Sequence, residues 1–141
     1  MKNKVFYLCL LALPAMLLFY SMSTQKPNEK KQWKMISAHG WKVKDMVKNG
    51  KTVDIVKYTG DQFYSFFTEK EGKKKINKVK IEIGSETRLF ECGIVGDSIK
   101  LYNAGTWNNY KIVSVEKESA VLEQVALGAN VQWNLVPRVN Q

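Results

Sequence analysis

From residue 31 to residue 136 the chain is a succession of short segments in which apolar and polar residues alternate, separated by turn residues. This period of two is typical of half-buried β-strands. No stretch longer than ten residues shows the 3.6-residue period of an amphipathic helix. The segments expected to form strands are residues 31–37, 41–47, 52–58, 62–67, 76–83, 87–95, 98–102, 107–115, 120–125 and 131–136. The sequence therefore predicts an all-β domain.

The connections between these segments are about two to seven residues long, which is typical of neighbouring antiparallel strands. Asn49-Gly50 is the clearest hairpin turn, because both residues tolerate positive φ. A meander of this length favours closure into a barrel, which removes exposed sheet edges. We expect an up-and-down antiparallel barrel of about eight to ten strands, with its domain at residues 31–138 and a signal helix before it.

The N-terminus has the pattern of an export signal. Lys2 and Lys4 precede an uncharged apolar run at residues 5–20, and the small residues Ser21 and Ser23 follow it. The run is shorter than the roughly 20 residues of a membrane-spanning helix. We expect residues 1–23 to be a cleaved signal peptide, with a retained membrane anchor as the alternative. Residues 24–30 are expected to form a flexible tether, and the domain is expected to work outside the cytoplasm, in the periplasm or secreted.

The chain is basic, with 22 Lys and Arg against 13 Asp and Glu. Such a balance favours anionic partners, while solvated strand faces are the simpler explanation. Residues 72–75 form a basic tip that two further lysines continue along one strand face. The candidate contacts for an anionic surface or glycan are Lys73, Lys74, Lys75, Lys78 and Lys80. Export argues against nucleic acid as the partner.

Residue types for catalysis or metal binding are sparse. His39 is the only histidine, and Cys92 is the only cysteine after residue 23. Cys92 shares a strand face with Phe90 and Ile94, so it is expected to be a buried apolar residue and not a nucleophile. We expect no catalytic residues, no metal site and no cofactor, and the protein is not expected to be an enzyme.

Four segments together resemble small lipocalin-like (calycin-type) secreted bacterial domains, many of which have no assigned function. The segments are residues 32–37 (QWKMIS), 57–63 (KYTGDQF), 96–101 (GDSIKL) and 131–133 (VQW). Lys31 stands where those domains have a glycine before the first Trp. The resemblance implies a barrel whose base is closed by Trp33.

Aromatic residues are the remaining indication of function. The candidates to line a cavity for a small apolar or amphipathic ligand are Trp33, Trp41, Phe63, Phe67, Phe90, Trp107 and Trp133. The competing explanation is a filled core, because a small barrel needs bulky side chains to avoid voids. The leading hypothesis is a ligand-binding barrel. The alternative is a surface-acting module with a solid core and a basic patch for an anionic partner.

Overall fold

The computed structural model describes residues 27–126 and 128–139, which form two helices and nine strands. Their order is α2 (Pro27–Ile36), β1 (Trp41–Lys48), β2 (Lys51–Val53), α3 (Ile55–Thr59), β3 (Gln62–Glu71), β4 (Lys74–Ile83), β5 (Glu86–Val95), β6 (Ser98–Asn103), β7 (Thr106–Val115), β8 (Ala120–Ala126) and β9 (Ala129–Pro137). The predicted signal peptide, residues 1–23, lies outside the described residues. No helix within the described ranges has the length and apolar character needed to cross a membrane.

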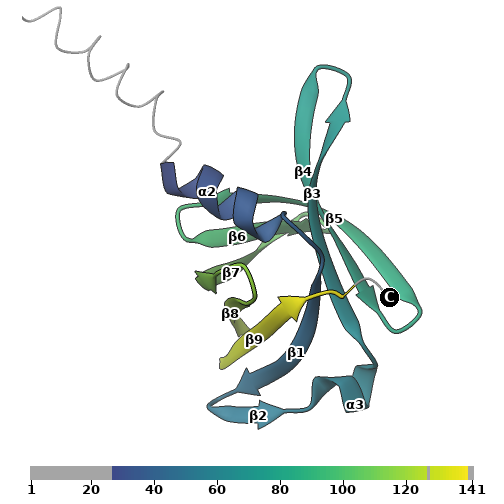
Figure 1. Cartoon of the computed structure of the whole chain (residues 1–141), viewed down its shortest axis with the longest axis vertical. Helices are drawn as coiled ribbons and strands as arrows, with labels where there is room; N and C mark the ends of the chain where they lie inside the picture. Colours follow the sequence, from purple (N-terminus) through teal and green to yellow (C-terminus); the bar gives the residue numbers. More distant parts are fainter. Residues whose placement is uncertain (1–26, 127, 140–141) are drawn as a thin grey trace, which may run out of the picture.

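The strands form one antiparallel meander that closes on itself (Figure 1). Each strand from β3 to β9 pairs with the next, and β1 pairs with both β3 and β9. The closed barrel therefore contains β1 and β3 to β9, eight strands, and β2 is a ninth strand beside β1. The predicted all-β barrel is confirmed. The Asn49-Gly50 hairpin is also confirmed, with φ values of 49° and 76° at these two residues.

The predicted first strand at residues 31–37 is wrong, because the chain from Pro27 to Ile36 is helical. Pro27 occupies the start of the helix, where its fixed φ suits a helix and its missing N–H is not needed. Glu29 lies in the first turn and Lys34 in the last, both favourable for the helix dipole. The flexible tether predicted at residues 24–30 is corrected for residues 27–30, which belong to α2, and residues 24–26 lie outside the described residues.

Helix α2 is packed against the barrel through its apolar face. Ile36 is fully buried, and Trp33 packs edge-on against Phe66 of β3 with ring centroids 6.3 Å apart. Near the other end of the helix, the Glu29 carboxylate accepts a 2.7 Å hydrogen bond from the backbone N–H of Gly96 in the β5–β6 turn. The resemblance implied that Trp33 would close the barrel from a strand. Trp33 does pack on the core, but from a helix.

The interior faces of the strands supply the core. The buried side chains are Ile36, Trp41, Val43, Phe66, Val79, Cys92, Ile99, Leu101, Ile112, Ala120, Leu122 and Leu135. They come from α2 and from all eight barrel strands. The burial predicted for Cys92 is confirmed.

Two further segments differ from the sequence prediction. The strand expected at residues 52–58 ends at Val53, and α3 follows it; the Asp54 side chain accepts a hydrogen bond from the N–H of Lys57 at the start of that helix. The connection between the strands expected at residues 62–67 and 76–83 is instead the end of a long hairpin. Strands β3 and β4 remain paired as far as Glu71 and Lys74, and the hairpin extends past the barrel (Figure 1).

Candidate functional site

A cavity of about 10 Å³ lies in the described part of the barrel interior, lined by Tyr64, Phe66, Val79, Ile99, Leu101, Tyr110 and Leu122. A space of this size is close to the minimum that a single water molecule needs. Burial raises the pKa of the Tyr64 hydroxyl well above its usual range, with a smaller contribution from Tyr110. This part of the interior is a packed core and does not provide the volume of a small-molecule site.

The seven predicted ligand-binding aromatics do not line this cavity, and the structure does not gather them at one place. Trp41 is fully buried, and Trp33, Phe90 and Trp133 pack partly buried against the core. Phe67 and Trp107 are exposed, by 36% and 56%. Phe63 stacks with the Arg138 guanidinium, 4.1 Å from its ring centroid. The residues that do line the cavity include Tyr64 and Tyr110, which sequence reasoning missed, although Tyr64 shares its strand face with Phe66.

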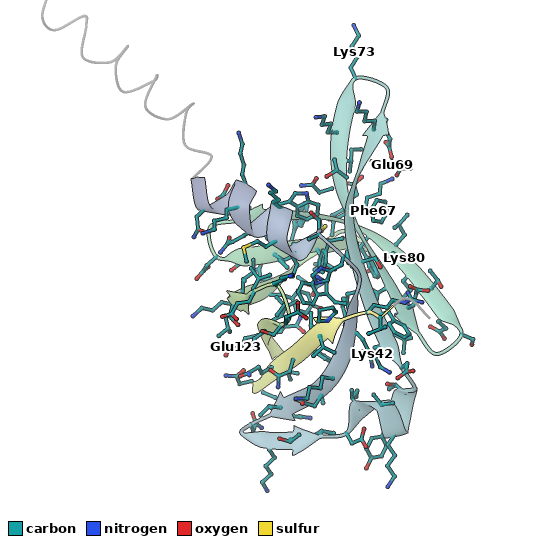
Figure 2. The ribbon with its side chains drawn as sticks, in the orientation of Figure 1. Lys42, Phe67, Glu69, Lys73, Lys80 and Glu123 are labelled. Atoms are coloured by element: carbon teal, nitrogen blue, oxygen red, sulfur yellow. The ribbon has the colours of Figure 1, made fainter. Side chains whose placement is uncertain are left out.

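The β3–β4 hairpin is the most prominent surface feature (Figure 2), and Lys73 marks its tip. Every residue from Phe67 to Lys75 is exposed. Of the five lysines predicted to contact an anion, Lys73, Lys74 and Lys75 lie in this exposed tip. Lys78 and Lys80 lie further along β4, where they form ion pairs with Glu69, Glu71 and Glu82.

On one face of this hairpin, the positive charges of the lysines are balanced by nearby carboxylates. The Lys78 ammonium contacts the carboxylates of both Glu69 and Glu71, the latter at 2.8 Å. These contacts raise the pKa of Lys78, and the hydrogen bond from Lys78 lowers the pKa of Glu71. Lys74 lies directly across the ladder from Glu71. Lys74 and Lys78 therefore share their face with acidic neighbours.

The opposite face carries two lysines side by side. Lys70 and Lys75 are cross-strand partners, so their side chains leave the ladder on the same side. Neither has an ion-pair partner among the described residues. Like charges directly opposite each other destabilise a ladder by a few tenths of a kcal/mol to about 1 kcal/mol. Lys70 was missed from the sequence because it was assigned to a loop, where no cross-strand partner is defined.

A groove of about 230 Å³ lies between this face and α2, and it is lined by Glu29, Lys30, Trp33, Asn77 and Ile94. We call it the hairpin groove. The Trp33 indole N–H donates to the Thr68 hydroxyl at 3.2 Å, and that hydroxyl donates to the Asn77 side-chain oxygen at 2.8 Å. Thr68 and Asn77 form the rung two residues closer to the barrel than Lys70 and Lys75. The groove and the lysine pair therefore form one continuous surface.

The residues considered for nucleophilic or metal chemistry lie in the core or in a turn. Cys92 is buried on β5, and burial raises the pKa of its thiol to about 12. The His39 ring packs against the Trp41 ring in a tilted arrangement, with centroids 4.3 Å apart. Within the described ranges no three His, Cys, Asp or Glu side chains are grouped so that they could hold a metal ion.

Comparison with protein-family models, with curated proteins and with solved structures gave no match to this chain.

Proposed function

We propose that the protein is an exported binding module that holds an anionic glycan along the basic face of the β3–β4 hairpin. The observation that carries this proposal is the cross-strand pair Lys70–Lys75, exposed and without an acidic partner among the described residues. An anion placed between two ammonium groups relieves their repulsion and gains charge-assisted hydrogen bonds. On the opposite face of the hairpin, Lys78 is already paired with Glu69 and Glu71, so an added anion would not relieve a repulsion between lysines there.

The hairpin groove favours a chain-like glycan over a flat membrane surface. A membrane would meet the tip, whereas a polysaccharide can lie along the groove and reach both lysines. Trp33 offers an aromatic side chain that can pack against a sugar ring, and Asn77 offers an amide for its hydroxyl groups. Lys30 adds a third positive charge at the groove. Aromatic and amide groups beside cations suit an acidic sugar better than a phospholipid headgroup layer.

Two further parts of the proposal rest on the sequence. The small lipocalin-like secreted domains resembled by residues 57–63, 96–101 and 131–133 are barrels as well, and we propose a calycin-type relationship on that basis. We also propose export, with cleavage near Ser23. Mass spectrometry of the protein isolated from its host tests export: an N-terminus near Thr24 supports it, and an intact cytoplasmic chain contradicts it.

Isothermal titration with two anionic polysaccharides, heparin and alginate, tests the binding proposal. The variant carries Lys70→Gln and Lys75→Gln. The control carries Lys48→Gln and Lys51→Gln, which removes a second exposed cross-strand lysine pair at the β1–β2 hairpin. If each lysine contact contributes about 0.7 kcal/mol, losing both weakens binding about tenfold. The control should bind like the unaltered protein.

Three results would contradict the proposal. The first is an equal loss of affinity in the hairpin variant and the control, which would indicate a general effect of net charge. The second is an affinity that does not change with salt, because contacts between exposed charges weaken as salt is added. The third is binding to vesicles that contain phosphatidylglycerol without binding to either polysaccharide, which would make a membrane the partner.

A further inference from the structure

A second groove lies on the other flank of α2, away from the hairpin. Its volume is about 520 Å³, and it is lined by Lys31, Lys34, Met35, Ala38, His39, Glu116 and Lys117. We call it the helix groove. In α2, Lys31 and Met35 are four residues apart and therefore lie one above the other on one stripe of the helix. Trp33 and Lys30 belong to the stripe that faces the hairpin groove.

The lining of the helix groove combines an apolar part, which we call the floor, with a charged part, which we call the rim. Met35, Ala38 and the aliphatic parts of the lysines supply apolar surface. The charged lining contains three ammonium groups, from Lys31, Lys34 and Lys117, and one carboxylate, from Glu116. None of these four residues has an ion-pair partner in the described part of the chain.

His39 adds a second observation at the same place. Its Nε2 atom is shielded from solvent and lacks a hydrogen-bond partner among the described residues. Its ring is held against Trp41 and contributes to the groove wall. An enclosed polar atom without a partner is costly, and an ordered water or a bound ligand is one way in which such an atom is satisfied.

We propose that the helix groove binds a single-chain amphipathic anion: an alkyl chain that ends in a carboxylate or a comparable anionic group. The apolar floor would cover the chain, and the ammonium groups at the rim would contact the anionic end. A purely polar anion would leave Met35 and Ala38 without a contact, and a neutral alkane would leave the three ammonium groups unpaired. The volume lies in the range of small-molecule sites. The proposal does not depend on the hairpin groove.

Chemical-shift mapping and titration with dodecanoate, below the concentration at which it forms micelles, test this proposal. We expect shifts at Met35, Ala38, His39 and Lys117, and saturable binding. Burial of one CH₂ group contributes about 0.8 kcal/mol, so each added carbon should tighten binding about fourfold. Dodecanol should bind at least about tenfold more weakly than dodecanoate, because the alcohol has no charge for the rim. Dodecyl phosphate should bind comparably if the site accepts any anionic headgroup.

Two variants separate the parts of the site. Ala38→Trp fills the exposed end of the floor without changing charge, and Lys31→Gln with Lys117→Gln removes charge from the rim. Each should weaken dodecanoate binding by about tenfold or more, while Lys30→Gln on the opposite flank should leave it unchanged. Shifts confined to other parts of the barrel, or equal affinity for dodecanol and dodecanoate, would overturn the proposal. So would unaltered binding by both groove variants.

Discussion

The indole nitrogen of Trp41 donates a 2.7 Å hydrogen bond to the main-chain carbonyl of Ile36, and both residues are fully buried. The last carbonyl groups of a helix have no partner within the helix. Trp41, the first residue of β1, supplies the partner for one of them. A single side chain therefore joins the C-terminal end of α2 to the first strand of the barrel.

Trp41→Phe tests this connection, because phenylalanine keeps most of the apolar area and removes the donor. The carbonyl of Ile36 would then be buried without that partner, which costs about 1–3 kcal/mol of unfolding free energy. Urea denaturation followed by circular dichroism measures the change. The control is Trp107→Phe, at a side chain that is 56% exposed, where the expected change is within about 0.5 kcal/mol. Equal stability of the two variants would refute the structural role given to Trp41.

Helix α2, whose C-terminal end is bonded to Trp41, is the main difference between the structure and the sequence prediction. The reason for this difference lies in the local sequence. In residues 31–37 an alternation of period two was assigned to a strand, although Trp33 and Ile36 also have the spacing of one helix face. Pro27, Glu29 and Lys34 are start and stop signals for a helix, and they would have favoured the correct assignment. Helix α3 has comparable signals, since Asp54 precedes it and Gly60 follows it.

The barrel was predictable because the sequence pattern that specifies it is repeated in many separate segments. Every strand from β3 to β9 carries its own alternation and its own turn, so an error in one segment does not alter the topology. The candidate sites were not predictable in the same way. The pairing of Lys70 with Lys75 depends on the register of β3 and β4, and the helix groove depends on where α2 docks. Both depend on the tertiary arrangement of segments, which the residue pattern within one segment does not specify.

Lys75→Glu should raise stability while it weakens glycan binding. The new carboxylate would lie opposite Lys70 and convert a repulsive pair into an attractive one, which adds about 0.5 kcal/mol to the free energy of unfolding. Thermal denaturation and polysaccharide titration of the same protein measure the two effects. Lys51→Glu, opposite Lys48, is the matched control. It should stabilise by a similar amount and leave glycan affinity unchanged; a loss of affinity in both variants would argue against a localised site.

The carboxyl group of Glu71 should titrate below its ordinary pKa, because Lys78 donates a hydrogen bond to the ionised form. A lowered pKa in the folded state stabilises the protein above the ordinary value of 4.5, and this contribution is lost as the pH falls through the lowered value. Side-chain carbon chemical shifts measured against pH report the midpoint. In Lys78→Met the midpoint should move upward. An identical midpoint in both proteins would show that the contact is not maintained in solution.

Alkaline pH should destabilise the barrel through Cys92. Burial raises the pKa of this thiol from 9.0 to about 12 in the folded protein, whereas the unfolded chain keeps the ordinary value. Below about pH 9 both states are protonated, and the stabilising effect is complete. Between about pH 9 and 12 only the unfolded state releases the proton, so the free energy of unfolding should fall by about 1.4 kcal/mol per pH unit. Tyr64, whose pKa is also raised by burial, adds a decline of the same sign at higher pH.

Urea denaturation at a series of pH values between 7 and 11 measures this decline, and Cys92→Ala isolates the contribution of the thiol. The variant should be less stable at neutral pH, because the buried sulfur leaves a small void. Its stability should nevertheless fall less steeply above about pH 9, since it lacks the group that ionises on unfolding. Labelling of Cys92 with a thiol reagent at pH 8 should be slow in the folded protein and fast in urea. Rapid labelling of the folded protein, together with parallel pH profiles for the two proteins, would show that the thiol is accessible and that β5 does not bury it.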